Sequence, residues 1–220
     1  LISLSHYRNS GLAWKMAPNL VLDFDVEGLT TKPIMVPDPD GTRWGTATQR
    51  QPPVVFETWV KCDDDDKAGD PPNTTVDRTS ALLRFDVGGR AGLELGVTSG
   101  SPYARFENAS GLEEKAGGET NQARALTEGE WYHLAAVYDQ GGKFLLLYVN
   151  GNELVRWYCR STPVSGAGTV QIGAAGLVGV CFDEIRVWTG YRDRGSIVSN
   201  LRKELDGATA GLAAYYRFDD

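Results

Sequence analysis

Two adjoining stretches decide the fold: Trp131-Tyr-His-Leu-Ala-Ala-Val-Tyr-Asp139 and Lys143-Phe-Leu-Leu-Leu-Tyr-Val-Asn-Gly151. Each is short and rich in aromatic and aliphatic residues, and turn residues follow each of them, which is typical of β-strands. The turn at 139–142 joins the two strands, so the pair predicts a hairpin in which a glycine supplies a positive φ. Asn150-Gly151 predicts a second turn immediately afterwards.

Similar segments recur along the chain, and Gly, Pro, Asn or Asp lies between them. With 26 glycines and 10 prolines, this spacing predicts an all-β sandwich of two sheets rather than a helical bundle. The predicted strands are 20–26, 54–61, 81–87, 91–97, 131–138, 143–150, 169–174, 182–188 and 212–218.

One helix is predicted at 196–206, with Ser196 as its cap and Gly207 as its stop. Its apolar stripe suits a lid over the end of a sheet, and consists of Ile197, Val198, Leu201 and Leu205. The strand at 143–150 is apolar on both faces, although an outer strand of a sandwich needs only one apolar face. We therefore expect its second face to be covered by the helix, by the N-terminal segment, or by another domain or partner.

The 220 residues predict one domain at 20–220. Residues 1–19 lie outside the strand pattern and are expected to form an added strand or an interdomain segment. The polar stretches 62–80 and 107–125 are predicted to be long loops. Because the sequence begins with Leu, we expect a processed chain or a segment of a longer protein.

The charge balance excludes some partners. There are 22 Lys and Arg against 29 Asp and Glu, which gives a net charge of -7 and no basic footprint for nucleic acid. No apolar run approaches the roughly 18 residues of a membrane span, so no membrane insertion is predicted.

Five motifs in order resemble the laminin-G-like and pentraxin-like jelly rolls of the concanavalin A-like type. Besides the opening pair, they are Leu22-Asp-Phe-Asp25, Val55-Phe-Glu-Thr-Trp-Val-Lys61, Phe182-Asp-Glu-Ile-Arg-Val-Trp188 with Tyr191-Arg-Asp193, and Gly211-Leu-Ala-Ala-Tyr-Tyr-Arg-Phe-Asp-Asp220. The resemblance implies a two-sheet antiparallel jelly roll with one short helix near the C-terminus. The family includes lectins, adhesion modules and glycan-cleaving enzymes, so function has to be argued from sites.

The resemblance also raises the question of a calcium-binding site. The pentraxin calcium loop would lie between residues 173 and 182, where this chain has no carboxylate, so that site does not carry over. The resemblance places the closing strand beside the opening strand, and it then implies one structural Ca²⁺ held by Asp23, Asp25, Asp219 and Asp220. The alternative is a set of solvated carboxylates with Arg217 as a basic neighbour.

Asp23, Asp25 and Glu27 would share one face of a strand. Such a row resembles the E-x-D-x-E signature of jelly-roll glycoside hydrolases, in which two carboxyl groups do the chemistry. The first position is Asp rather than Glu, however, and the row lies near the start of the domain. A glycan hydrolase is therefore the alternative hypothesis.

Other candidate residues are aromatic, thiol or imidazole side chains. Trp44, Tyr103 and Trp157 fall outside the best core positions and are the predicted ligand-binding platform for a sugar ring. A Cys159–Cys181 disulfide is possible, with buried thiols as the alternative, while Cys62 adjoins an acidic loop. His133 is expected to pack within its strand, and because P-loop and Rossmann motifs are missing, no organic cofactor is predicted.

The sequence thus favours a non-catalytic recognition or adhesion module of a larger extracellular or cell-surface protein. Its expected partners are a glycan or protein ligand and neighbouring domains of the same polypeptide. A structural spacer is a further alternative.

Overall fold

The structure is a computed structural model that describes residues 3–7, 19–23, 33–36, 54–62, 79–118, 126–175, 177 and 179–218. In this part of the chain, strands and one short helix follow one another as expected for an all-β protein. The strands are β1 (Ser3–Tyr7), β2 (Asn19–Asp23), β3 (Ile34–Val36), β4 (Val55–Cys62), β5 (Ser80–Val87), β6 (Arg90–Thr98), β7 (Ser101–Glu107), β8 (Glu113–Gly117), β9 (Trp131–Asp139), β10 (Phe144–Val149), β11 (Asn152–Tyr158), β12 (Thr169–Ile172), β13 (Val180–Trp188) and β14 (Leu212–Tyr216).

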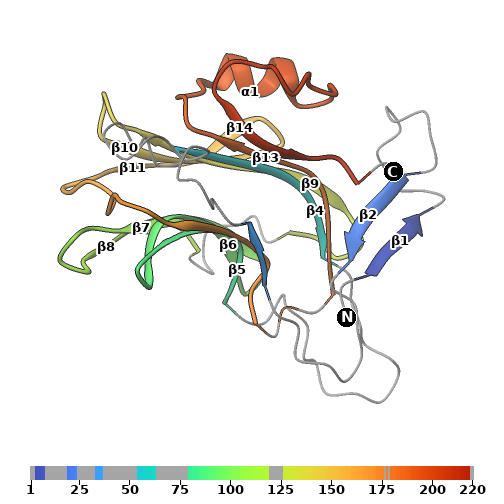
Figure 1. The fold of residues 1–220 in the computed structure, drawn as a ribbon, viewed down its shortest axis with the longest axis horizontal. Helices are drawn as coiled ribbons and strands as arrows, with labels where there is room; N and C mark the ends of the chain where they lie inside the picture. Colours follow the sequence, from blue (N-terminus) through green and yellow to red (C-terminus); the bar gives the residue numbers. More distant parts are fainter. Residues whose placement is uncertain are drawn as a thin grey trace.

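The strands form two antiparallel sheets that pack face to face (Figure 1). Sheet A has the order β1-β2-β13-β4-β9-β10-β11, with β14 also paired to β13. Sheet B has the order β3-β12-β5-β6-β7-β8. This arrangement confirms the predicted two-sheet jelly-roll sandwich.

The main core lies between the two sheets, because alternate residues of both sheets point inward. Phe56 of β4 and Leu145 of β10 belong to sheet A, and Leu93 of β6 belongs to sheet B. All three are fully buried. Their burial follows from the alternation of inward- and outward-facing residues along each strand. It stabilises the folded state by about 25 cal/mol for each Å² of apolar surface that is removed from water.

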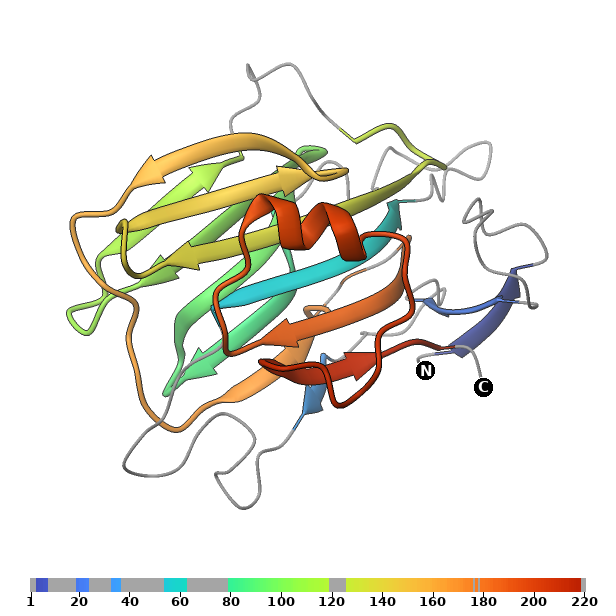
Figure 2. The ribbon, with the colours of Figure 1, turned by 90° about the horizontal axis from the view of Figure 1, so that it is seen from above.

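A second core covers the outer face of sheet A. Leu146 and Tyr148 of β10 point away from the main core and pack in one cluster with Ile197 of α1 (Arg194–Asn200). Figure 2 shows α1 lying across this face. The helix therefore covers the second apolar face of β10, while the first faces the main core. No helix in the described ranges is long and apolar enough to cross a membrane.

The helix differs from the predicted one in its bounds. It begins at Arg194, because Asp193 rather than Ser196 is the cap, and the Asp193 carboxylate accepts a hydrogen bond of 2.7 Å from the Ser196 N–H. It ends at Asn200, several residues before Gly207. The hairpin at 139–142 is confirmed, but the positive φ of 55° falls on Lys143 rather than on a glycine of the turn.

The closing strand does not lie beside the opening strand. Both β14 and β2 pair with the same edge of β13, one after the other: Tyr216 is opposite Ile185, and Leu22 is opposite Phe182. The predicted pairing of these two strands was therefore wrong. The strands instead follow each other along one edge of sheet A.

Candidate functional site

Among the side chains of sheet A whose burial the structure describes, the edge strand β11 carries the most exposed aromatic ones. It pairs with β10, and within the described ranges it has no neighbour on its other side. Trp157 is 45% exposed and Tyr158 is 60% exposed. Because consecutive residues of a strand point to opposite faces, these two rings lie on opposite sides of the sheet.

The indole of Trp157 is held in a fixed orientation. Trp157 is paired with the core residue Leu145, so its ring is directed toward the gap between the edges of the two sheets. There its Nε1–H donates a hydrogen bond of 2.8 Å to Oε2 of Glu114, a residue of β8 in sheet B. The hydrogen bond thus links the two sheets and leaves part of the ring open to solvent.

Glu114 is itself buried and fully engaged. Its other carboxylate oxygen accepts hydrogen bonds from the N–H groups of Arg160 and Ser161, at 2.8 and 3.1 Å, and from the Ser161 hydroxyl. Burial alone would raise the pKa of Glu114, but the hydrogen bonds from Trp157, Arg160 and Ser161 outweigh burial and hold the pKa below its usual value. The residue that orients Trp157 is therefore an ionised carboxylate.

On the opposite face of β11, Tyr158 adjoins a small aromatic and ionic cluster. Its ring meets Phe144 edge-on, with 5.7 Å between ring centroids. The Arg156 guanidinium lies 5.1 Å from the Phe144 centroid. Two hydrogen bonds of 2.9 and 2.6 Å join Arg156 to Glu153, so this arginine is already neutralised by its neighbour.

Of the three aromatic residues predicted as a ligand platform, Trp157 is thus the one that the structure places at the surface. Tyr103 is only 1% exposed, so the prediction was wrong for this residue, because a buried ring offers no face to a sugar. Trp44 lies outside the described residues. The sequence does not distinguish Tyr103 from Trp157, because neither β7 nor β11 was predicted as a strand. The face of the sheet to which each ring points was therefore unknown.

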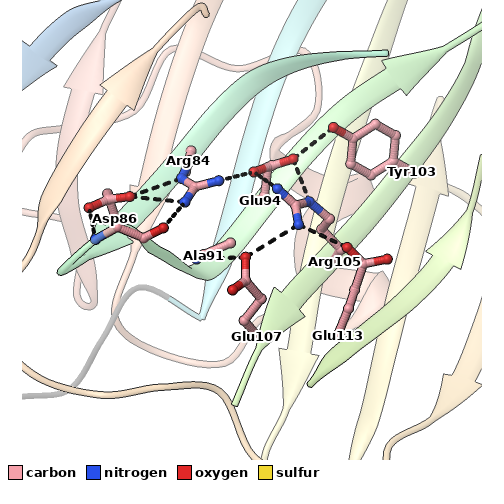
Figure 3. A network of polar contacts seen from close by, with 9 residues as sticks. Arg84, Asp86, Ala91, Glu94, Tyr103, Arg105, Glu107 and Glu113 are labelled. Atoms are coloured by element: carbon pink, nitrogen blue, oxygen red, sulfur yellow. Dashed lines mark hydrogen bonds and ion pairs between the residues drawn. The ribbon is translucent and has the colours of Figure 1, made fainter. Parts of the chain in front are cut away.

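Tyr103 belongs to a polar network on the outer face of sheet B, which it joins through its hydroxyl (Figure 3). Arg84, Glu94 and Arg105 lie directly opposite one another on three adjacent strands. The Glu94 carboxylate accepts hydrogen bonds from both arginines and from the Tyr103 hydroxyl, at 2.7 to 2.9 Å. All of its acceptor positions are used within the protein, so the carboxylate offers no free acceptor to a ligand.

A second polar cluster lies beneath α1. His133 is buried in β9, as expected, and its Nε2 lies 3.3 Å from Oε2 of Glu57. Arg186 donates hydrogen bonds to the carbonyls of Asn200 and Lys203 at 2.9 and 2.6 Å. The Asn200 carbonyl belongs to the last turn of α1 and the Lys203 carbonyl lies just beyond it, so the cluster anchors the end of the helix to sheet A.

The predicted metal and catalytic residues fall mainly outside the described part of the chain. Asp25, Glu27, Asp219 and Asp220 are not described, and for Asp23 only its strand position, opposite Cys181, is given. Within the described ranges no three His, Cys, Asp or Glu side chains are grouped closely enough to hold a metal ion. Calcium binding at the ends of the domain therefore stays a prediction.

The cysteines do not form the disulfide that was considered. Cys62, Cys159 and Cys181 are buried thiols, so the alternative of buried cysteines holds. Burial, with a smaller influence of the Glu114 charge, raises the pKa of Cys159 to about 12. Such a thiol stays protonated and unreactive near neutral pH.

The fold and its covered faces define a jelly-roll sandwich domain. The family model of the concanavalin A-like lectin/glucanases superfamily matches residues 52–197, and the chain belongs to this family. A comparison by sequence with curated proteins finds no match.

Several solved structures share the fold. A protein from Bacteroides ovatus with a proposed role in carbohydrate binding aligns with a TM-score of 0.53 and 17% identity, over 86% of this chain and 48% of its own. The binding domain of Paraclostridial Mosquitocidal Protein 1 aligns with a TM-score of 0.54 and 10% identity, over 90% and 44%. The binding domain of botulinum neurotoxin DC, solved in complex with SialylT, aligns with a TM-score of 0.52 and 10% identity, over 68% and 35%. The chain thus spans less than half the length of each.

Proposed function

We propose that this domain is a non-catalytic glycan-binding module and that Trp157 is its principal contact residue. The observation that carries the proposal is the indole of Trp157, which is 45% exposed and held by a buried carboxylate. A ring that is already fixed loses little conformational entropy when a ligand binds. Indole faces stack on the apolar faces of sugars, and structures with the same fold include binding domains.

The environment of three buried carboxylates supports binding rather than hydrolysis. Glycosidases need two carboxyl groups that both reach the scissile bond. Glu94 and Glu114 are occupied by internal donors, and Glu57 lies buried beneath α1. The proposal includes an extracellular or cell-surface setting, where glycans are displayed to such modules.

The test is a glycan array on the purified domain, followed by titration calorimetry on each hit with the wild type and with Trp157→Ala. We expect Trp157→Ala to lose most of the binding. Because this variant also removes one hydrogen-bond donor from the buried Glu114, its melting temperature should fall by several degrees, so binding is measured well below the melting temperature of both proteins. Met35→Ala is the matched control, because Met35 is 49% exposed on β3, at the opposite edge of sheet B from β8.

Three results would contradict the proposal. Equal binding by Trp157→Ala and the wild type would place the site elsewhere. A wild type that binds no glycan on the array would favour the structural spacer. Release of reducing sugars from a polysaccharide panel would show that the domain is an enzyme.

A further inference from the structure

The two exposed rings of β11 set a condition on the size of the ligand. Trp157 faces the gap between the sheets, whereas Tyr158 faces the outer side of sheet A together with Phe144. A single sugar ring cannot stack on both, because the strand itself lies between them. A ligand that contacts both rings has to pass over the free edge of β11.

The surface beyond Tyr158 continues the aromatic contact. Tyr191 precedes α1 and is 52% exposed. Its pKa is raised by partial burial and by the negative charges of Asp139 and Asp193, whereas the positive charge of Arg156 lowers it. Three residues further on, the Arg194 guanidinium donates hydrogen bonds to the Gly151 carbonyl at 3.0 Å and to Oδ1 of Asn152 at 3.2 Å, so the segment that carries Tyr191 lies against the β10–β11 hairpin. The exposed rings therefore extend from Trp157 over the edge toward Tyr191.

The edge of β11 is poorly suited to pairing with another strand. The register shifts between Leu147 and Tyr148, so that Val155 and Glu153 are their respective partners and Leu154 forms a bulge. A bulge and a neighbouring ion pair, here Glu153 with Arg156, are features that protect edges from added strands. The occupant of this edge is therefore not a β-strand of another chain.

The charges around the rings point to a neutral ligand. Arg156 is joined to Glu153 by two hydrogen bonds, and both oxygens of Glu114 accept bonds within the protein. Further charges around the rings are of both signs, with the exposed Arg160 just after Trp157 and Asp193 near Tyr191, so the edge presents no patch of a single sign that would select an ionic ligand. The chain also carries a net charge of -7, which repels sulfated and uronic acid polymers.

From these observations we infer that the ligand is a neutral, linear glycan, longer than a single sugar, that passes over the edge of β11 and contacts Trp157 on one side and Tyr158 and Tyr191 on the other. This inference rests on the proposed function, and it adds the ligand class and two further contact residues. The rings supply stacking surface, and the polar edge of the strand between them lies next to the sugar hydroxyls.

The experiment measures affinity against chain length. The probes are neutral gluco-, xylo- and manno-oligosaccharides, from the monosaccharide to the hexasaccharide, with heparin and polygalacturonate as anionic comparators. We expect the affinity of the wild type to rise with length and the anionic polymers not to bind. Each lost ring should lower affinity about three- to tenfold.

The variants separate the two sides of the edge. Trp157→Ala should weaken binding at every length, whereas Tyr158→Ala and Tyr191→Ala should weaken only the longer chains. Tyr158→Phe keeps the ring and should bind like the wild type, which also serves as the folded control if Tyr158→Ala is unstable. Melting temperatures are measured for all four variants.

The failures of the two proposals are distinguishable. If Trp157→Ala weakens binding but Tyr158→Ala and Tyr191→Ala do not at any length, the proposed function stands and the passage over the edge is wrong. Affinity that does not change with length, or tight binding of heparin, also overturns the inference. If the wild type binds no member of the series, the neutral linear glycan is excluded; hits on the array would then keep the proposed function.

Discussion

Single buried carboxylates in this protein are bonded by donors from other strands. Glu94 accepts from arginines on the two neighbouring strands of sheet B, and Glu114 accepts from Trp157 and from the turn that follows β11. Each carboxylate satisfies several donors, which offsets the cost of removing its charge from water. These residues therefore fix parts of the chain that are distant in sequence.

The first prediction concerns Glu114. Its folded-state pKa lies below the ordinary 4.5, so the stability that it contributes is present above about pH 4.5 and is lost as the pH falls through the folded-state pKa. We expect Glu114→Gln to lower the free energy of unfolding at pH 7 by about 1–3 kcal/mol. In thermal melts between pH 2 and 7, Glu114→Gln should lose less stability in acid than the wild type does.

Glu113→Gln is the matched control for this measurement. Glu113 is the neighbouring residue of β8, its side chain is 47% exposed, and it bonds to Arg105 at 2.8 Å. Its replacement should cost at most about 1 kcal/mol. An acid profile of Glu114→Gln identical to that of the wild type would show that the carboxylate does not hold the turn and Trp157 as described.

At the scale of elements, α1 accounts for the second apolar face of β10, because the two pack against each other. β10 has two apolar faces because Leu145 and Leu147 enter the main core while Leu146 and Tyr148 enter the core beneath α1. At the end of the helix, Trp59 and Arg186 donate to the carbonyls of Leu201 and Asn200, at 3.1 and 2.9 Å. Sheet A thus holds the helix by both apolar and polar contacts.

The second prediction follows from this double burial. Leu145→Lys and Leu146→Lys should each lower the free energy of unfolding by at least about 3 kcal/mol, since each places an unpaired charge in a core. Chemical denaturation measures both. Leu112→Lys is the control, because Leu112 is 58% exposed and its replacement should cost less than about 0.5 kcal/mol.

A mild effect of Leu146→Lys together with a change in oligomeric state would contradict this prediction. It would mean that a partner, and not α1, is the main cover of the outer face. Size-exclusion chromatography of the two lysine variants, beside the wild type, makes that distinction.

The sequence predicts the strands whose hydrophobic pattern is continuous and misses those whose burial depends on polar partners. β4, β9, β10 and β13 are rich in aromatic and aliphatic residues, and all four were predicted. β8 was predicted to be part of a loop, because Glu113–Gly117 contains three charged residues. Glu114 can be buried there only because Trp157 and the 160–161 turn supply donors, and no local pattern reveals a partner more than forty residues away.

The candidate site was only partly predictable for the same reason. The sequence identifies Trp157 as an aromatic residue outside the core pattern, but β11 itself was not predicted, so the opposite orientation of Tyr158 could not be foreseen. Tyr103 was assigned to the surface because nothing in its neighbourhood indicates that its hydroxyl donates a hydrogen bond to Glu94, which is itself bonded by Arg105. Side-chain partners across strands are a property of register, which the sequence alone does not fix.

At the scale of the whole molecule, the two outer faces of the sandwich carry different groups. The outer face of sheet A is covered by α1, whereas that of sheet B carries the ionic row of Arg84, Glu94 and Arg105 (Figures 1 and 3). The edge of β11 lies between these faces and presents exposed aromatic rings. A ligand that binds at this edge would leave both α1 and the ionic row in place, which agrees with the proposed site.

The last prediction concerns the two ends of the sandwich. β2 and β14 follow each other along one edge of β13. Acidic residues come late in both segments of the sequence: Asp23 is the last residue of β2 and Asp25 follows it, and Asp219 and Asp220 come after β14. A calcium ion shared by these carboxylates would bind the native state only. At a hundredfold excess over its dissociation constant it would add about 2.7 kcal/mol, or roughly 5–10 °C in melting temperature for a chain of this size.

Thermal melts in EDTA and in millimolar calcium chloride test this expectation on the wild type, on Asp219→Ala and on Glu130→Ala. Glu130 is an exposed carboxylate in the turn before β9, so its removal should leave any calcium response unchanged. A calcium-dependent rise in the wild type and in Glu130→Ala, but not in Asp219→Ala, supports the shared ion. A wild type with the same melting temperature in both buffers means that these carboxylates are solvated, because an ion that binds only the folded state has to raise its stability.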